Sequence, residues 1–239
     1  MKKNIAGMLV LASLMACGGG GGDSEPPITV TISPSTATTS GVVGMYPDGV
    51  GLQVSAVLSK TPTGTVYPVI QSSSSAIRSG VADAVVTGTN TYSVIVHSVP
   101  TLTAGTYTGT LSLRLCKDAQ CASEYPLTGA SVPFSIKMIP LPTFTLTTTP
   151  ANGAPSTTTV AAGNPYNVPN GQAFTLTSDT PVTWSVQNDE ANITGQTTTA
   201  TVFSGVVTKV SGISGGMVDV FAAPVDVPDY SMRFVIEPQ

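Results

Sequence analysis

Apolar and polar residues alternate along several stretches of the chain, most regularly over residues 106–116. Apolar side chains occupy one phase there, while hydroxyl residues and Arg114 occupy the other. Successive side chains of a β-strand point to opposite faces, so this pattern predicts a strand with one buried face. The same alternation occurs over 52–58 and 132–138, and no stretch shows a sustained helical period. The pattern predicts an all-β protein.

Between residues 28 and 139 turn sequences such as Pro47-Asp48-Gly49 separate seven short apolar stretches. Seven short strands in about 110 residues is typical of an immunoglobulin-like β-sandwich. The stretch 102–107 resembles the tyrosine corner of such domains, which assigns Tyr107 to the structural core. Strands are expected over residues 28–33, 50–59, 65–70, 81–87, 91–98, 106–116 and 131–138.

The sequence IPLPTF, residues 139–144, is a proline-stiffened joint between two strand patterns. We place a domain boundary there, with an Ig-like sandwich over 28–139 and a second over 140–239. Trp184 alternates with two valines in the second part, so we assign it to the core. The segments PVTWSV, GVVTKVSG and MVDVFA resemble the bacterial Ig-like domains of group 2. The chain departs from that family in an insert over 188–203 and in the loop 224–230.

The N-terminus has the features of an export signal. Lys2 and Lys3 precede an apolar run that is too short to span a bilayer. The run ends in Leu14-Met15-Ala16-Cys17, which resembles the lipobox of bacterial lipoproteins. The resemblance implies a signal peptide over residues 1–16 that is removed, and a Cys17 that carries fatty acyl chains. Two or three chains give an effectively permanent membrane attachment.

Residues 17–27 follow as a lipidated cysteine and a glycine-rich linker. A chain of this composition and of roughly ten residues reaches about 15 to 20 Å. The residue after the cysteine is Gly18 and not an aspartate. By resemblance to Gram-negative lipoproteins, this implies that the protein is sorted to the outer membrane. The sequence leaves open whether the protein faces the periplasm or the cell surface.

Composition excludes one class of partner. Without Lys2 and Lys3, seven basic residues stand against thirteen acidic ones, so the mature chain is acidic. Nucleic-acid binding needs a basic face, and we expect no such partner. Only 9% of residues are charged, which predicts strand faces covered by Ser and Thr hydroxyls.

Cys116 and Cys121 flank a four-residue turn at the end of a predicted strand. Opposed residues of an antiparallel hairpin lie about 4.5 to 5.5 Å apart at Cα, which is within disulfide range. Export to an oxidising compartment favours the bond, so we expect a disulfide. The loop that follows, with Glu124 and Tyr125, is the expected contact surface.

Catalytic and metal sites find little support. Gly212-Ile213-Ser214-Gly215-Gly216 fits a nucleophile-elbow pattern but lacks a histidine after it, and His97 is the only histidine. We therefore expect no enzyme activity, no cofactor and no metal. Loop carboxylates such as Asp226 and Asp229 leave calcium as a weaker alternative.

The sequence thus predicts a lipid-anchored envelope protein that acts as a non-catalytic binding, adhesion or structural module. The membrane is one partner, through the lipid anchor, and the other is an unknown protein or glycan. A glycan-binding module and a passive spacer of an envelope assembly are the alternatives. Few aromatic residues are free for a glycan platform, which weakens the first of these.

Overall fold

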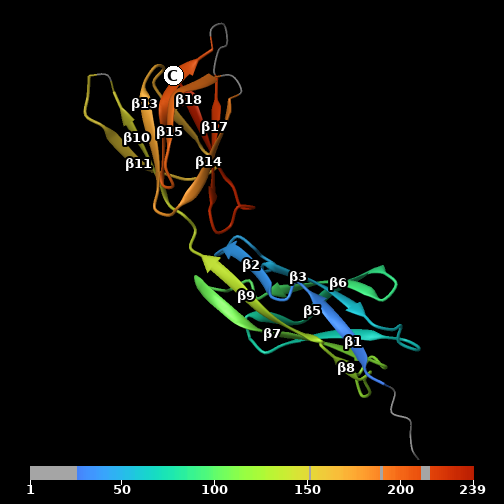
Figure 1. Ribbon diagram of the computed structural model, residues 1–239. Helices are drawn as coiled ribbons and strands as arrows, with labels where there is room; N and C mark the ends of the chain where they lie inside the picture. Colours follow the sequence, from blue (N-terminus) through green and yellow to red (C-terminus); the bar gives the residue numbers. More distant parts are fainter. Residues whose placement is uncertain (1–25, 151, 189–190, 211–215) are drawn as a thin grey trace, which may run out of the picture.

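The computed structural model describes residues 26–150, 152–188, 191–210 and 216–239. These residues form eighteen strands in four sheets and contain no helix (Figure 1). The protein is therefore all-β, as the alternation predicts. Strands β1 to β9 make two of the sheets and β10 to β18 make the other two. We call these parts the N-terminal and the C-terminal sandwich.

The N-terminal sandwich packs a sheet of order β5-β6-β3-β1-β8 against a sheet of order β2-β9-β7-β4. Most neighbours are antiparallel, but β2 runs parallel to β9 and β8 runs parallel to β1. The strands are β1 (Ile28–Ser33), β2 (Ala37–Val42), β3 (Gly51–Leu58), β4 (Tyr67–Ser72), β5 (Ile77–Gly88), β6 (Thr91–Ser98), β7 (Gly105–Cys116), β8 (Leu127–Thr128) and β9 (Ser131–Ile139).

The C-terminal sandwich has a similar arrangement, with sheets of order β11-β10-β13-β16-β15 and β12-β18-β17-β14, but its edge strand β11 is antiparallel to β10 where β8 is parallel to β1. Here β12, parallel to β18, takes the place that β2 has beside β9. The strands are β10 (Phe144–Thr149), β11 (Ser156–Val160), β12 (Pro165–Val168), β13 (Ala173–Ser178), β14 (Val182–Asn188), β15 (Ala191–Thr198), β16 (Val202–Lys209), β17 (Val218–Pro224) and β18 (Met232–Pro238).

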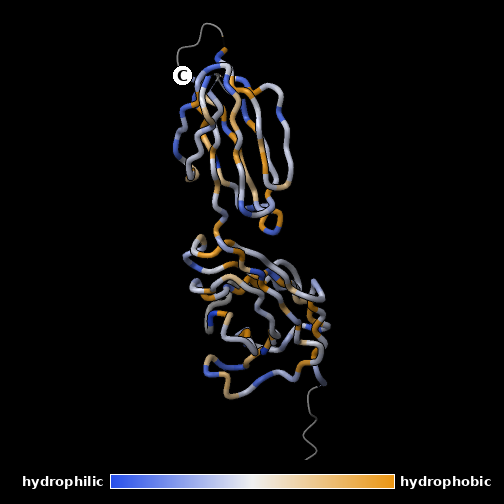
Figure 2. The backbone as a smooth tube through the Cα atoms, turned by 90° about the vertical axis from the view of Figure 1, so that its left-hand side faces the viewer, coloured by the Kyte–Doolittle hydropathy of each residue, from blue (hydrophilic) through white to orange (hydrophobic). Residues whose placement is uncertain are grey.

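The alternating apolar positions form the cores, and hydropathy changes from residue to residue along many strands (Figure 2). In the N-terminal sandwich Leu111 on β7 pairs with Val132 on β9, and both are buried. Gly109 lies where an added Cβ would come within 2.7 Å of the Phe134 ring, so the close approach there needs glycine. The cores hold Leu52, Val54, Val96, Phe134 and Ile136 in one sandwich, and Phe174, Leu176, Phe203, Phe234 and Ile236 in the other.

All seven strands expected between residues 28 and 139 are present, with ends shifted by a few residues. The alternation missed β2, because its hydroxyl residues and glycine carry little apolar signal. It also missed β8, which is only two residues long. The domain limits at 139 and 140 stay a prediction, although no strand of one sandwich pairs with a strand of the other within the described ranges.

Both aromatic residues assigned to the core are half-buried at its margin. The hydroxyl of Tyr107 donates a hydrogen bond to the carbonyl oxygen of Thr103 at 3.1 Å, which is the bond that defines a tyrosine corner. The indole of Trp184 packs edge-on against Phe144 and donates from Nε1 to the carbonyl of Thr199 at 3.1 Å. Trp184 therefore belongs to the core margin and is not an exposed platform.

The two sandwiches are stacked end to end and touch through the loop between β17 and β18 (Figures 1 and 2). In that loop Asp226 forms an ion pair with Lys137 of β9 at 2.8 Å, and its carbonyl accepts a hydrogen bond from Ser40. Tyr230 donates to the sulfur of Met45 at 3.1 Å. These contacts show what the unexpected loop 224–230 does: it joins the second sandwich to the first.

An open cleft of about 410 Å³ lies beside these contacts, between β2 and the same loop. Tyr46 and Asp229 line it. Burial raises the pKa of Tyr46, and the nearby Tyr230 and Asp229 raise it further.

Replacing Tyr107 with phenylalanine should lower the free energy of unfolding by about 1 to 2 kcal/mol, because it removes the hydrogen bonds of the Tyr107 hydroxyl to the carbonyl and the hydroxyl of Thr103 and leaves the ring in place. Urea-induced unfolding measures the loss. Tyr92→Phe is the matched control, since that half-buried tyrosine makes no side-chain hydrogen bond within the described residues. Equal losses in both variants would show that the Thr103 bond contributes nothing.

Candidate contact site at the disulfide loop

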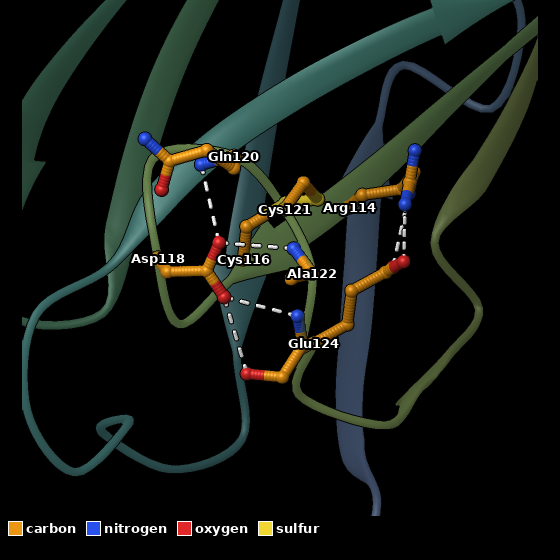
Figure 3. A network of polar contacts seen from close by, with 8 residues as sticks. Arg114, Cys116, Asp118, Gln120, Cys121, Ala122 and Glu124 are labelled. Atoms are coloured by element: carbon orange, nitrogen blue, oxygen red, sulfur yellow. Dashed lines mark hydrogen bonds and ion pairs between the residues drawn. A yellow bond between two sulfur atoms is a disulfide. The ribbon is translucent and has the colours of Figure 1, made fainter.

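The loop that follows β7 is closed by a disulfide between Cys116 and Cys121, whose Cα atoms are 4.9 Å apart (Figure 3). We call residues 116–126 the disulfide loop. Cys116 is fully buried at the end of β7. Cys121 has a φ of +55°, a left-handed conformation that residues other than glycine adopt rarely. The turn is therefore held in a conformation that needs support from its neighbours.

Asp118 supplies that support from inside the loop. Its carboxylate accepts hydrogen bonds from the backbone N–H groups of Gln120, Ala122 and Ser123 at 2.9 to 3.1 Å, and from the Ser123 hydroxyl (Figure 3). These bonds favour the ionised carboxylate, so the pKa of Asp118 lies below its ordinary value, with the bond from Ala122 as the largest cause. Aspartate commonly stabilises turns in this way, so the sequence Cys-Lys-Asp-Ala-Gln-Cys carries a signal for the role of Asp118.

An ion pair closes the base of the loop. Arg114 donates from Nε to one carboxylate oxygen of Glu124 at 3.0 Å and from a terminal nitrogen to the other. The pair is bidentate, which is the strongest arrangement for a guanidinium and a carboxylate. The Arg114 hydrogen bond lowers the pKa of Glu124, and the same contact raises the pKa of Arg114. The sequence predicted a role for Glu124 but not for Arg114, its partner ten residues earlier.

Tyr125 is buried, although we expected it on the contact surface of the loop. Only 4% of the residue is exposed, so it offers almost no area to a partner. Its hydroxyl donates to the carbonyl of Thr63, and Lys117 lies over its ring with Nζ 4.7 Å from the centroid. Tyr125 is thus a core residue that ties the disulfide loop to the β3–β4 loop, and this corrects its assignment to the contact surface.

What the loop offers to a partner is an open groove of about 390 Å³. Arg114 and Glu124 line one part of it, and Pro126, Leu127 and Ser131 line another. The groove combines an ion pair with a small apolar floor.

The two described cysteines lie apart from the histidine. Cys116 and Cys121 are joined, so neither is available as a nucleophile. His97 lies on β6, away from the disulfide loop at the other end of the strand. Residues 211–215, with most of the nucleophile-elbow pattern, and Cys17 both lie outside the described residues. The part of the chain that is described holds no cluster of three metal-binding side chains and no helix long and apolar enough to cross a membrane.

The site lies at one end of the N-terminal sandwich. The N–H of Ile28, at the start of β1, donates to the carbonyl of Pro126 at 2.8 Å, and Lys60 donates to the carbonyl of Pro26 at 2.8 Å. The disulfide loop, the β3–β4 loop and the start of β1 therefore lie together. We call this the tether end, and it is opposite the C-terminal sandwich (Figure 1).

The sheet orders define an immunoglobulin-like β-sandwich architecture in both parts of the chain. No protein-family model and no curated protein matches the sequence. The assignment therefore depends on strand order and on the tyrosine corner, and the narrower resemblance to group 2 domains stays a prediction.

Among solved structures, the chain is similar to titin domains Z1Z2 in complex with telethonin, with 11% identity over 88% of this chain and 96% of that chain and a TM-score of 0.26. It is also similar to invasin, a bacterial integrin-binding protein, with 13% identity over 88% and 40% and a TM-score of 0.30. A third is S-layer protein SbsC, domains 5–6, with 11% identity over 87% and 95% and a TM-score of 0.24. These distant similarities carry no argument about function.

The variant Asp118→Asn with Glu124→Gln should be less stable than the wild type at pH 7 and equally stable in acid. Both carboxylates have a lowered pKa in the folded state, so they stabilise it above the ordinary values of 3.8 and 4.5. That contribution is lost as the pH falls through the folded-state pKa values. Thermal unfolding between pH 7 and pH 2 measures the convergence. Glu237→Gln is the control and should follow the wild type, whereas a constant gap for the double variant would contradict the assignment.

Reducing the Cys116–Cys121 bond should lower the free energy of unfolding by about 2 kcal/mol, the loop-entropy value for so small a ring. Urea-induced unfolding with and without a reductant measures it. The variant Cys121→Ser has no bond to reduce, so it should be insensitive to the reductant. A wild type that is equally insensitive would show that the bond does not stabilise the fold.

Proposed function

We propose that this protein is a lipid-anchored lipoprotein of the bacterial outer membrane, and that its two Ig-like sandwiches act as a non-catalytic structural and binding module. One observation carries the proposal. Pro26, nine residues after Cys17, lies at the end of the N-terminal sandwich that is opposite the C-terminal one. An acylated Cys17 would hold the tether end near the bilayer and direct the C-terminal sandwich away from it.

The contacts between the sandwiches support a role in display. The Lys137–Asp226 ion pair and the Tyr230–Met45 hydrogen bond restrict the angle between them, and the joint 140–143 contains two prolines. A stacked pair of this kind keeps the second sandwich clear of the headgroups. Loops at the far end of that sandwich are then the surface available to a protein partner in solution or on another cell.

A glycan-binding role receives less support from the surface. Carbohydrate recognition uses exposed aromatic rings, and Tyr67 is the one large aromatic residue that is exposed within the described ranges. Trp184 packs on the core margin. A protein partner or a purely structural role therefore fits better than a glycan.

Replacing Cys17 with alanine should move the protein from the membrane fraction to the soluble fraction, because no acyl chain can be attached. Fractionation of cells that express each variant, followed by immunoblotting, measures the shift. Cys121→Ser removes a different cysteine, so it should stay with the membrane. A Cys17→Ala protein that still fractionates with the membrane would overturn the lipid-anchor proposal.

A further inference from the structure

Four of the eight large apolar side chains that stay exposed within the described residues lie at the tether end of the N-terminal sandwich. Val86 is 69% exposed, Val85 59%, Val57 45% and Tyr67 40%. Of the other four, Ile95 lies in the middle of β6, and Met45, Leu141 and Val225 lie at the junction between the sandwiches. The four at the tether end stay exposed with every described residue in place.

Strand register places these four side chains at the same end. Val86 is opposite Tyr92 and Val57 is opposite Thr91, so both lie beside the β5–β6 turn. The N–H of Leu58 donates to the carbonyl of Asn90 in that turn, and Leu58 is opposite Val30 near the start of β1.

On the other sheet Tyr67 is opposite Cys116, at the base of the disulfide loop. The exposed group is therefore formed by the first residue of β4, the end of β3 and the tip of the β5–β6 hairpin.

We propose that this end of the protein rests on the surface of the membrane that anchors it, with Val85 and Val86 of the β5–β6 hairpin inserted among the lipid headgroups. The inference depends on the proposed acylation of Cys17. Nine Cα steps separate Cys17 from Pro26, so even a fully extended segment holds the tether end within about 30 Å of the anchor. The surface that the anchor brings nearest is thus the lipid surface itself.

The chemistry of the tether end suits uncharged or zwitterionic headgroups. Valine side chains can be buried at the boundary between headgroups and acyl chains, and tyrosine is enriched in that layer. The two carboxylates nearby are already satisfied, Asp118 by loop N–H groups and Glu124 by Arg114. Lys60 and Lys117 also lie at this end, at the carbonyl of Pro26 and over the Tyr125 ring, whereas the hairpin tip that is inserted, residues 85–91, carries no charge. Docking should therefore depend little on ionic strength.

The test uses the acylated full chain in phosphatidylcholine vesicles. Val86→Cys is labelled with a polarity-sensitive fluorophore while the native disulfide stays intact, and lipids with a spin label in the acyl chain act as quenchers. Val225→Cys is the matched control, since Val225 is 58% exposed but lies at the junction. Mass spectrometry of the N-terminal peptide establishes acylation in each sample, and circular dichroism establishes folding. Val85→Cys replaces Val86→Cys if the latter does not fold.

We expect at least twofold quenching at position 86, little at position 225, and the same result at 50 mM and 500 mM salt. Acylated protein that sediments with the vesicles but shows no quenching at 86 would overturn the docking and leave the lipid anchor standing. A blue-shifted label that lipid does not quench, and whose shift grows with protein density, would mean that a second copy covers the hairpin, which also overturns it. Protein with an unmodified Cys17 would overturn the anchor and the docking together.

Discussion

The structure depends on burying alternating apolar side chains between paired sheets while hydroxyl side chains cover the outside. Charged residues make up only 9% of the chain, so the solvent faces cannot be covered by charge. Pairs of hydroxyls bond across neighbouring strands instead, as between Thr147 and Thr157 at 2.9 Å and between Ser112 and Ser131 at 3.2 Å. This surface is polar enough to stay hydrated although it carries few charges.

On a surface covered mainly by hydroxyl side chains, two kinds of feature are unusual. Exposed valines are unusual on a surface of threonines, and a bidentate ion pair is unusual where charges are scarce. Both occur at the tether end, the valines on the β5–β6 hairpin and the pair Arg114–Glu124 at the base of the disulfide loop. That end also holds the disulfide and the start of β1. One end of one sandwich thus holds the disulfide, the bidentate ion pair and four of the exposed apolar side chains.

The sequence predicted the class of fold and the strands with strong alternation, because every second residue of such a strand is apolar and points to the core. It could not predict β2, whose hydroxyl residues pack beside β9 through backbone pairing. The disulfide was predictable because a hairpin brings the two cysteines within bonding range and the expected export favours the oxidised form. The burial of Tyr125 was not predictable, because the tyrosine hydroxyl bonds to Thr63, which lies 62 residues earlier in the chain. The role of the loop 224–230 was hidden for the same reason: its partners, Lys137 and Met45, belong to the other sandwich.

Neutron reflectometry of the acylated protein on a supported bilayer tests most directly whether the molecule stands on its tether end. The predicted profile has protein density that begins at the headgroups without a water layer and extends outward for the length of two stacked sandwiches. Deuteration of the C-terminal sandwich, through segmental labelling, should place its density in the outer half of that layer. A profile only one sandwich thick, or C-terminal density next to the headgroups, would contradict this orientation.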